Sequence, residues 1–552
     1  MIAIIEAYQS GLLTWKHIKH NLIAGIVVGI VALPLAMAFA MASGVKPEQG
    51  IYTAIMASFI VGIFGGTRSQ ISGPTGAFVV ILAAITAQHG IVGLQIATMM
   101  AGVILILLGV CKLGNVIKII PYPVILGFTG GIGVIIFVGQ WKDFFGLSVT
   151  IPIDASFYTK CHLLIEALPR FDPNTTCLSL FSLLILIISP RYIKIPSTLI
   201  AILVATLTQY YYDFANIATI GSVFGHIPQS FPAFGLPDYS QITLSDLIIP
   251  AFTIALLGAI ESLLSATTAD TLTGTKHHAN QELKGQGYAN FIAPLFGGFA
   301  STGAIARTVT NIKNGGTSPI AAVVHAIFLL LVLLLLAPYA IHIPLAVLAA
   351  ILFVVAFNMS DIPEFIHTLK GAPWYDSFVL VTTFLLTIFI DLVIAVTIGV
   401  ILSGLFFLMR THQTIKINKN NFKHIKHFAV TPKIGTSLFC DGLIYTLEGP
   451  FFFGVSEQIE HALAIGHIEP KFVVFQLSHM PFIDMTGLKA LSKTIRKYQN
   501  RGIKVYLCGM NKKVAQKISK IGILKILQGP SVFESLEEIT KFQEKNNDAL
   551  AT

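Results

Sequence analysis

The chain has 552 residues, of which 54% are hydrophobic and only 11% are charged. A soluble domain carries about 25% charged residues, so this composition excludes a protein that water solvates along most of its length. The charge is unevenly placed. Residues 1–409 hold 16 basic and 16 acidic residues, whereas residues 410–552 hold 20 and 11, which is the whole net charge of +9. We interpret the basic tail as a domain beside an anionic membrane surface; a nucleic-acid-binding patch is the alternative.

The sequence contains no motif that predicts a cofactor, a metal site or an enzyme. The five cysteines are scattered, without the spacing of a zinc site or a disulfide framework. P-loop, HExxH and GxSxG motifs do not occur. The pair His277 and His278 lies in a polar loop, where we expect both side chains to be solvated rather than bound to a metal. We therefore predict no cofactor and no catalytic residues.

Fourteen apolar segments between residues 21 and 410 predict membrane helices, since a spanning helix needs about 20 apolar residues. Lys and Arg cluster before the first segment and after the last, so the positive-inside rule places both termini in the cytoplasm. That placement requires an even number of spans. The segments are approximately 22–41, 51–64, 74–87, 91–110, 115–138, 176–189, 195–208, 245–266, 287–299, 302–311, 318–338, 343–357, 377–390 and 392–409.

Two motifs recur in the two halves of the membrane region. Phe-Gly-Gly at 64–66 is followed by Thr-Gly-Ala at 75–77, and Phe-Gly-Gly at 296–298 is followed by Thr-Gly-Ala at 302–304. The Thr-Gly-Ala copies fall in the third and tenth segments. An offset of seven is odd, so the halves have opposite orientations in the membrane, as in a 7+7 inverted repeat. The alternative is that both motifs only allow close helix packing.

Short, Gly-interrupted segments at matching places in inverted halves point to the binding site of a transporter. A half-helix that starts inside the membrane presents unpaired N–H groups and a partial positive charge. Two such ends that face each other form an anion site without a fixed cation. Small residues let the anion approach the backbone, and these are Gly76, Ala77, Gly303 and Ala304.

Three ionisable residues interrupt the apolar segments, and charges inside a membrane are functional candidates by default. Glu261 lies in the eighth segment with Ser265 one turn later, and desolvation of such a carboxyl group favours its protonated form. We predict that these two residues couple transport to protons; a structural hydrogen bond is the alternative. Arg307 could neutralise substrate charge or pair with Glu261, or it could reach water at a helix end. We expect Asp391 to lie in a turn.

The pattern changes near residue 431 to short strands alternating with amphipathic helices, which predicts a small α/β domain. Strands are expected at 442–447, 472–477 and 504–508, and helices at 487–500 and 511–519. Asp484 or Thr486 is suited to cap the first of these helices. The chain then divides into a cytoplasmic N-terminal segment (1–20), a transmembrane transporter domain (21–410), a linker (411–430), the α/β domain (431–545) and a tail (546–552).

These features resemble the sulfate permease (SulP) family of anion transporters, which end in a STAS domain. The most specific block is 257–318, from LGAIESLLSATTADTLTGTKH to GAIARTVTNIKNGGTSP, and it looks closest to bacterial C4-dicarboxylate transporters of that family. The resemblance implies a polytopic α-helical membrane protein of fourteen spans in a 7+7 inverted repeat with core and gate domains, and a cytoplasmic STAS domain. It also implies a homodimer in the bacterial inner membrane.

The resemblance implies a substrate site between the N-termini of the third and tenth helices. Sodium-coupled bicarbonate relatives carry Asp in place of Glu261, Thr in place of Ile305, and no arginine at Arg307, so protons are the expected coupling ion here. Met485 occupies the position of a phosphorylatable serine in related STAS domains, which argues against that switch. The implied substrate-binding residues are Phe39, Thr75, Gly76, Ala77, Thr302, Gly303, Ala304 and Arg307.

The resemblance, together with Glu261, thus implies proton-coupled uptake of succinate, fumarate or aspartate by alternating access. A sulfate or bicarbonate transporter or anion exchanger of the same family is the alternative. A passive anion channel and a membrane-anchored signalling module remain as other classes. Expected partners are the anionic substrate, protons, the lipid bilayer, a second copy of the chain and a cytoplasmic protein that binds the STAS domain, but no nucleic acid.

Overall fold

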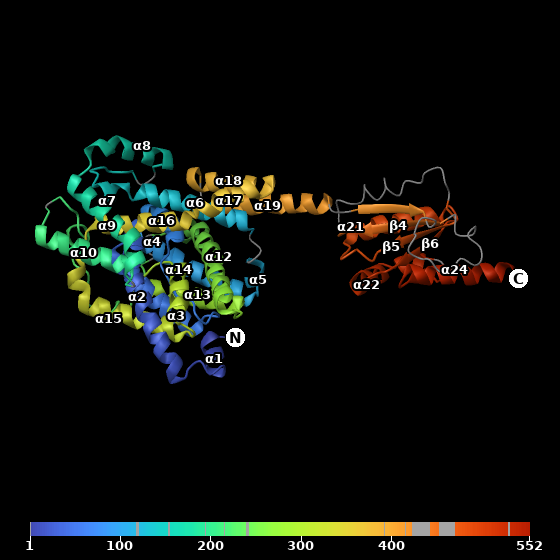
Figure 1. Cartoon of the computed structure of the whole chain (residues 1–552), viewed down its shortest axis with the longest axis horizontal. Helices are drawn as coiled ribbons and strands as arrows, with labels where there is room; N and C mark the ends of the chain where they lie inside the picture. The colour runs from blue at the N-terminus through green and yellow to red at the C-terminus, as the bar shows by residue number, and fades with distance from the viewer. Residues whose placement is uncertain are drawn as a thin grey trace. The chain divides into compact units, whose positions relative to one another are not determined.

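The computed structural model describes residues 2–117, 121–152, 155–193, 195–214, 216–238, 242–390, 392–413, 416–421, 442–451, 470–527 and 530–551. The chain forms two compact units, Met1–Ser403 and Gly404–Thr552 (Figure 1). Asp391, predicted to lie in a turn, is outside the described residues.

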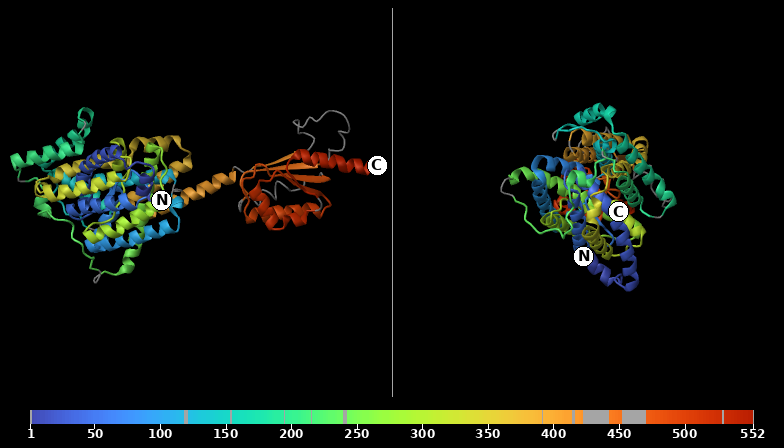
Figure 2. Two further views of the ribbon diagram at one scale, coloured as in Figure 1. Left: turned by 90° about the horizontal axis from the view of Figure 1, so that it is seen from below. Right: turned by 90° about the vertical axis from the view of Figure 1, so that its left-hand side faces the viewer.

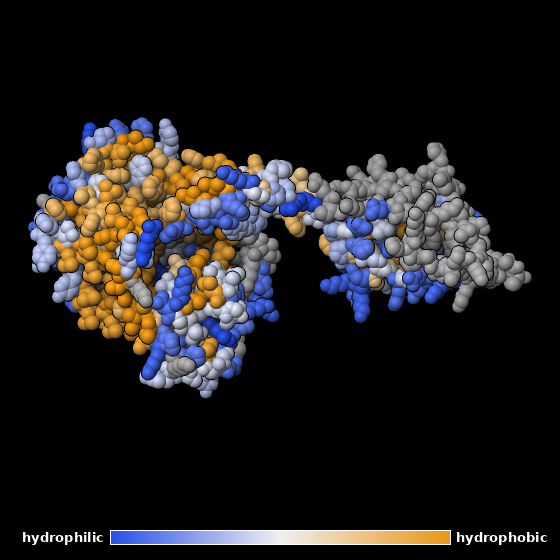
Figure 3. Space-filling model, in the orientation of Figure 1, coloured by the Kyte–Doolittle hydropathy of each residue, from blue (hydrophilic) through white to orange (hydrophobic). Residues whose placement is uncertain are grey.

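The first unit is a bundle of α-helices whose outer surface is largely apolar (Figure 3). Eight of its described helices, some extended by adjoining short helical turns, are long and apolar enough to cross a membrane. The helices of the bundle are α1 (Ala3–Gln9), α2 (Trp15–Ala42), α3 (Pro47–Phe64), α4 (Gly76–Val110), α5 (Gly114–Ile117), α6 (Tyr122–Gly139), α7 (Trp141–Phe145), α8 (Phe157–Ala167), α9 (Pro173–Tyr192), α10 (Ser197–Tyr212), α11 (Ile220–Phe224), α12 (Ile248–Thr273), α13 (Ala279–Ile292), α14 (Ile305–Lys313), α15 (Ile320–Ala340), α16 (Leu345–Ser360), α17 (Ile362–Gly371), α18 (Trp374–Phe389) and α19 (Leu392–Gln413).

Each of the fourteen predicted segments overlaps one of these helices, but several boundaries differ. The third and fourth segments are the two parts of α4, which breaks at Gly90 with φ 66° and ψ −176°. The fifth helix begins at Tyr122 rather than near 115. The ninth begins at Ala279 and is followed by a short 3₁₀ turn at Ala293–Phe296. Hydropathy misses the start of α13 because its first turns are polar.

The membrane helices form two groups that contact mostly their own members. One group contains α2, α3, α4, α12, α13, α14 and α15, and the other contains α6, α9, α10, α16 and α18. The first group takes its helices from the start of each predicted half, and the second takes the end of each half. This division matches the core and gate domains expected from the sequence.

Glycines allow close approach where helices of one group pack together. A Cβ atom added at Gly133 of α6 would lie 2.7 Å from the carbonyl oxygen of Ala356 in α16 and would also collide with Ser360. A Cβ at Gly102 of α4 would lie 2.7 Å from the carbonyl oxygen of Gly287 in α13. Helices in a membrane use small residues of this kind to pack closely. Lipid tails are as apolar as the helix surfaces, so no hydrophobic force drives the helices together and close van der Waals contact takes its place.

Gly133→Ala should therefore destabilise the protein by about 1–3 kcal/mol, because the added methyl group meets backbone that cannot move cheaply. The matched control is Gly139→Ala in the same helix, where an added Cβ has no atom within 4 Å. Thermal unfolding of the purified protein, followed by intrinsic fluorescence, should give a lower midpoint for the first variant only. Equal midpoints for both variants would contradict this packing.

The second unit is an α/β domain built on a five-stranded sheet in the order β3-β4-β5-β6-β7. The strand β3 pairs antiparallel with β4, and the remaining neighbours pair parallel. The elements are β3 (Lys416–Asn421), β4 (Gly442–Glu448), β5 (Phe472–Gln476), α21 (Met485–Gln499), β6 (Lys504–Cys508), α22 (Lys512–Lys520), α23 (Ile523–Ile526), β7 (Val532–Phe533) and α24 (Leu536–Ala551). The strand β3 lies in the segment that the sequence suggested as a linker, so the sheet starts earlier than expected.

Helices cover both faces of this sheet (Figure 2). On one face Tyr445 and Phe475 pack with the buried side chains of α21, α22 and α23. On the other face Ile444 and Tyr506 pack with Ile539 of α24. The Asp484 side chain caps α21 by accepting a hydrogen bond from the Gly487 N–H at 2.8 Å, which confirms the capping prediction for Asp484.

Burial raises the pKa of the Cys508 thiol, in β6, from 9.0 to about 12. The thiolate is the reactive form, so at pH 8 Cys508 should be alkylated about a thousand times more slowly than an ordinary cysteine. Mass spectrometry after iodoacetamide treatment of the folded protein should find Cys508 unmodified and the exposed Cys111 modified. Unfolding should remove the difference. Rapid alkylation of Cys508 in the folded protein would show that this face of the sheet is open.

Candidate functional site

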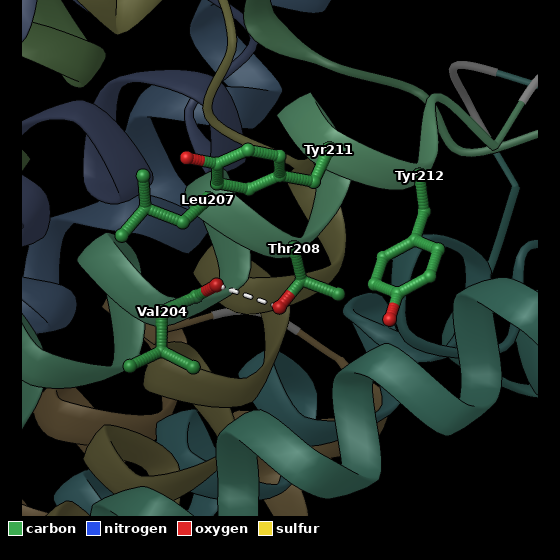
Figure 4. A pocket seen from close by; sticks show the side chains of 5 residues that line it. All are labelled: Val204, Leu207, Thr208, Tyr211 and Tyr212. Carbon is green, nitrogen blue, oxygen red and sulfur yellow. Dashed lines mark hydrogen bonds between the residues drawn. The ribbon is translucent and has the colours of Figure 1, made fainter.

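A surface groove on α10 has no charged side chain in its lining. Five side chains line it: Val204, Leu207, Thr208, Tyr211 and Tyr212 (Figure 4). None is charged, and the Thr208 hydroxyl already donates to the carbonyl oxygen of Val204 at 2.8 Å. The groove is part of the apolar outer surface, where lipid chains would cover it.

Two short strands cross inside the first group of helices and hold its two helix starts together. They are β1 (Ser72–Gly73) and β2 (Thr302–Gly303), which pair antiparallel with Ser72 opposite Gly303. The Ala304 N–H extends the pairing by donating to the carbonyl oxygen of Ile71 at 2.9 Å. Helix α4 begins at Gly76 and α14 at Ile305, directly after the crossing. The structure thus brings together residues 75–77 and 302–304, which lie more than 200 positions apart in the chain.

Neither helix start is capped by a side chain. Thr75 and Ala304 stand at the N-cap positions of α4 and α14, and neither side chain accepts a hydrogen bond from its helix. The first N–H groups of an α-helix have no partner within the helix, and together with the helix dipole they attract negative charge. Two uncapped starts at one place therefore form a region of positive potential that suits an anion.

The start of α14 is the accessible part of this region. Thr302 is fully buried, and Thr75 and Ala304 are 7% and 6% exposed. By contrast Ile305 is 38% exposed and Ala306 is exposed, although both lie at the start of a helix inside the bundle. Ile305 and Ala306 are therefore the exposed residues of this helix start.

Glu261 of α12 lies next to Thr75, at the start of α4. Its side chain is partly exposed, and its Oε2 atom accepts a hydrogen bond from the Thr75 hydroxyl at 3.0 Å. This bond places a carboxyl group beside the start of α4. A carboxylate at this position competes with a bound anion for the same positive potential, whereas a protonated carboxyl group does not.

Serines of α12 tie this helix to the second half of the crossing. The Ser262 hydroxyl lies 2.6 Å from the Thr302 hydroxyl and accepts a hydrogen bond from the Gly303 N–H at 3.1 Å. Ser265 donates to the Thr308 hydroxyl at 3.1 Å. Ser265 is therefore held against α14, whereas the hydrogen bond of Glu261 is with Thr75. Sequence reasoning missed Ser262 because a serine in a small-residue segment carries no signal of its own.

Arg307 of α14 is buried against the first strand of the crossing. It is 2% exposed, and its Nη2 atom donates to the carbonyl oxygen of Pro74 at 3.0 Å. Of the alternatives left open for Arg307, a direct ion pair with Glu261 is not found among the described residues. A Cβ atom at Gly73 would collide with the guanidinium group, so glycine is required there. Arg307 thus adds positive charge close to the two helix starts.

Phe39 covers the start of α4, as expected for an apolar wall. A Cβ atom at Gly76 would lie 3.3 Å from the ring of Phe39 in α2 and 2.6 Å from the sulfur atom of Met359 in α16. Phe39 is 5% exposed. Met359 belongs to the second group of helices, so the wall contains one side chain from each group. Sequence reasoning missed Met359, because a methionine in an apolar helix is ordinary.

A buried carboxylate network holds the crossing in place, and sequence reasoning missed it. Glu282 of α13 accepts hydrogen bonds from the Gly66 N–H at 2.9 Å, from Gln70 Nε2 at 2.8 Å and from Gln286 Nε2 at 2.9 Å. Gln286 also donates to the hydroxyl of Ser72 in β1 at 2.8 Å. Glu282 is fully buried. Gly66, the last residue of the first Phe-Gly-Gly motif, is therefore part of this network.

Glu282→Gln should lower the free energy of unfolding by about 1–3 kcal/mol, because a new amide N–H would face existing donors. The matched control is Glu166→Gln, whose side chain is 72% exposed. Thermal unfolding of both purified variants measures the difference. A midpoint for Glu282→Gln equal to that of the control would show that the network does not stabilise the crossing.

The prediction for the histidine pair was partly wrong. His278 is exposed, but the His277 side chain is buried, and its Nδ1 atom lies 2.7 Å from Asp270 Oδ2. The Asp270 carboxylate also accepts from the His277 N–H, which closes the turn between α12 and α13. Among the described residues no group of three His, Cys, Asp or Glu side chains could hold a metal ion.

Taken together, a helical bundle with an apolar surface and an internal anion-attracting pair of helix starts defines a membrane transporter for anions. Comparison with known families agrees: the sulfate permease family matches residues 18–383, and the STAS domain family matches residues 431–539. The chain belongs to the sulfate permease family, with a C-terminal STAS domain. Its relatives are transporters, so the protein is an anion transporter of this family and not an enzyme.

Several relatives resemble the chain over almost its full length. The protein named "Putative sulfate transporter YvdB" of Bacillus subtilis is 41% identical over 95% of this chain and 98% of its own. The bicarbonate transporter BicA of Picosynechococcus is 30% identical over 96% and 95%. Among solved structures, murine SLC26A9 superposes with a TM-score of 0.85 at 21% identity, covering 99% of this chain and 94% of its own. The BicA transmembrane domain gives 0.63 at 30% identity, covering 71% and 98%.

These relatives bear on the predicted substrate. The names found are those of sulfate and bicarbonate transporters, and the expected closeness to C4-dicarboxylate transporters is not supported. The alternative reading of the sequence, a sulfate or bicarbonate transporter, agrees better with them.

Proposed function

We propose that the protein carries a small oxyanion, with sulfate as the first candidate, across the membrane together with a proton. The observation behind this proposal is the pair of uncapped helix starts at the β1–β2 crossing, with Glu261 hydrogen-bonded to Thr75 beside them. The anion would lie at the N–H groups of α4 and α14. The residues named from the sequence around this position, including Phe39 and Ala304, would line it.

Charge balance supports a proton as the coupling ion. Each helix start is equivalent to about +0.5 charge. With the guanidinium group of Arg307 and an ionised Glu261, the region carries about +1. Protonation of Glu261 raises it to about +2, which balances a dianion such as sulfate. The dianion and the proton would therefore bind together and leave together.

The division into two helix groups supports alternating access. The helix starts and Glu261 belong to the first group, whereas Met359, which covers Gly76, belongs to the second. A movement of one group against the other would uncover Gly76 and close the opening at Ile305. Side chains at such an interface exchange contacts without breaking the hydrogen-bonded crossing.

Bicarbonate is the second candidate, because the BicA relative is 30% identical over nearly the whole chain. A C4-dicarboxylate carries the same charge as sulfate, so charge balance does not separate the two. We further propose a homodimer with both termini in the cytoplasm, which would place the STAS domain there as well. An uptake panel of sulfate, bicarbonate, succinate, fumarate and aspartate at two pH values distinguishes the substrates.

Glu261→Gln should abolish accumulation driven by a pH gradient while leaving exchange of labelled anion across the membrane. A gradient of one pH unit can sustain about a tenfold anion gradient for each coupled proton, because one unit corresponds to about 1.4 kcal/mol. The measurement is uptake into proteoliposomes with the membrane potential clamped at zero. The wild-type protein should approach tenfold accumulation, and the variant should only equilibrate.

Glu166→Gln is the matched control, since it removes a carboxyl group that is exposed and distant in sequence from the site. It should accumulate the anion as the wild-type protein does. Proton-driven accumulation by Glu261→Gln at the wild-type level would refute the role of Glu261. Equilibration by the wild-type protein itself would point to a passive channel.

A further inference from the structure

The helices on the two faces of the STAS sheet differ sharply in charge. Between Met485 and Phe533 the chain has eleven Lys and Arg residues and no Asp or Glu. This stretch contains α21, α22 and α23, which all pack on one face of the sheet. On the other face, α24 holds four acidic and two basic residues. The domain is therefore electrostatically polarised across its sheet.

The positive charge lies on the outer surface of one helical layer. Helix α21 buries Leu488, Leu491 and Ile495 against the sheet, and α22 buries Val514 and Ile518. The basic side chains occupy the remaining faces of these helices and are exposed, and Figure 3 shows hydrophilic residues along the lower edge of this unit. We call this surface the basic face; its exposed residues include Lys489, Arg496, Lys497, Lys512, Lys513 and Lys520.

Large apolar side chains are exposed among these charges. Met485 at the start of α21 is 55% exposed, Ile521 after α22 is 39% exposed, and Leu524 in α23 is 37% exposed. Basic residues combined with exposed apolar residues are typical of surfaces that lie in the interface of an anionic membrane. Each Lys or Arg near such a surface strengthens binding about fivefold.

We propose that the basic face of the STAS domain binds the anionic phospholipid surface of the bilayer in which the protein is embedded. Three observations favour lipid over an acidic protein. The described residues of this face between Met485 and Phe533 include no Asp or Glu that would fix the register of a protein partner. Its charge is spread over three helices. The strand β3 begins only three residues after α19 ends, so the domain is held at a high effective concentration near the bilayer.

The test is lysine footprinting of the full-length protein in nanodiscs of phosphatidylcholine alone or with phosphatidylglycerol. Acetylation rates, read by mass spectrometry, should fall severalfold for lysines of the basic face in the anionic nanodiscs. Lys541, on the opposite face, should react equally in both. Addition of high salt should restore the rates, since exposed charges are then screened. Equal rates in both lipids would overturn the proposal.

Two variants of equal charge provide the control. Lys512→Gln with Lys513→Gln should weaken docking about 25-fold, seen as loss of protection at Lys489, Lys497 and Lys520. Lys541→Gln with Lys545→Gln, on α24, should leave this protection unchanged. Full protection in the first variant would overturn the proposal. Protection that requires an added acidic protein, and not anionic lipid, would also overturn it.

Discussion

The antiparallel pairing of β1 with β2 is the constraint on which the site depends. Four residues, Ser72 and Gly73 with Thr302 and Gly303, fix the starts of two helices that come from opposite halves of the chain. A helix start inside a membrane leaves N–H groups that lipid cannot satisfy, so it is stable only where protein or solute provides partners. The crossing satisfies part of this need, and the first residues of α14, Ile305 and Ala306, remain exposed. An anion could bind to the remaining N–H groups of this helix start.

The polar residues around the crossing mainly stabilise the pairing of β1 with β2. Glu282 accepts three hydrogen bonds next to β1, while Ser262 holds β2 against α12. Arg307 donates a hydrogen bond to the carbonyl oxygen of Pro74, directly after β1. Buried polar groups in lipid are costly unless they are paired, so this network also keeps the helix starts in one arrangement. A site made from backbone N–H groups needs such rigidity, because no side chain can adjust to the substrate.

Much of the architecture could be predicted from the sequence. Apolar segments and the repeated Thr-Gly-Ala motifs located the membrane helices and the pair 75–77 and 302–304. The polar start of α13 was missed because hydropathy does not detect a buried polar helix, and Glu282 was missed with it. The sequence left open whether Arg307 pairs with Glu261. In the structure Arg307 donates to the carbonyl oxygen of Pro74 instead, and sequence spacing does not show which partner a long side chain reaches. Likewise β3 was missed because its sequence, KINKNN, is polar and pairs at the edge of the sheet.

The location of a bound anion tests the central claim most directly. Crystals of the protein with selenate, a sulfate analogue, would reveal the selenium atom by its anomalous scattering. We expect a peak between the starts of α4 and α14, within hydrogen-bond distance of the N–H groups of Ile305 or Ala306. A peak only at exposed basic side chains, with none at the β1–β2 crossing, would contradict the account.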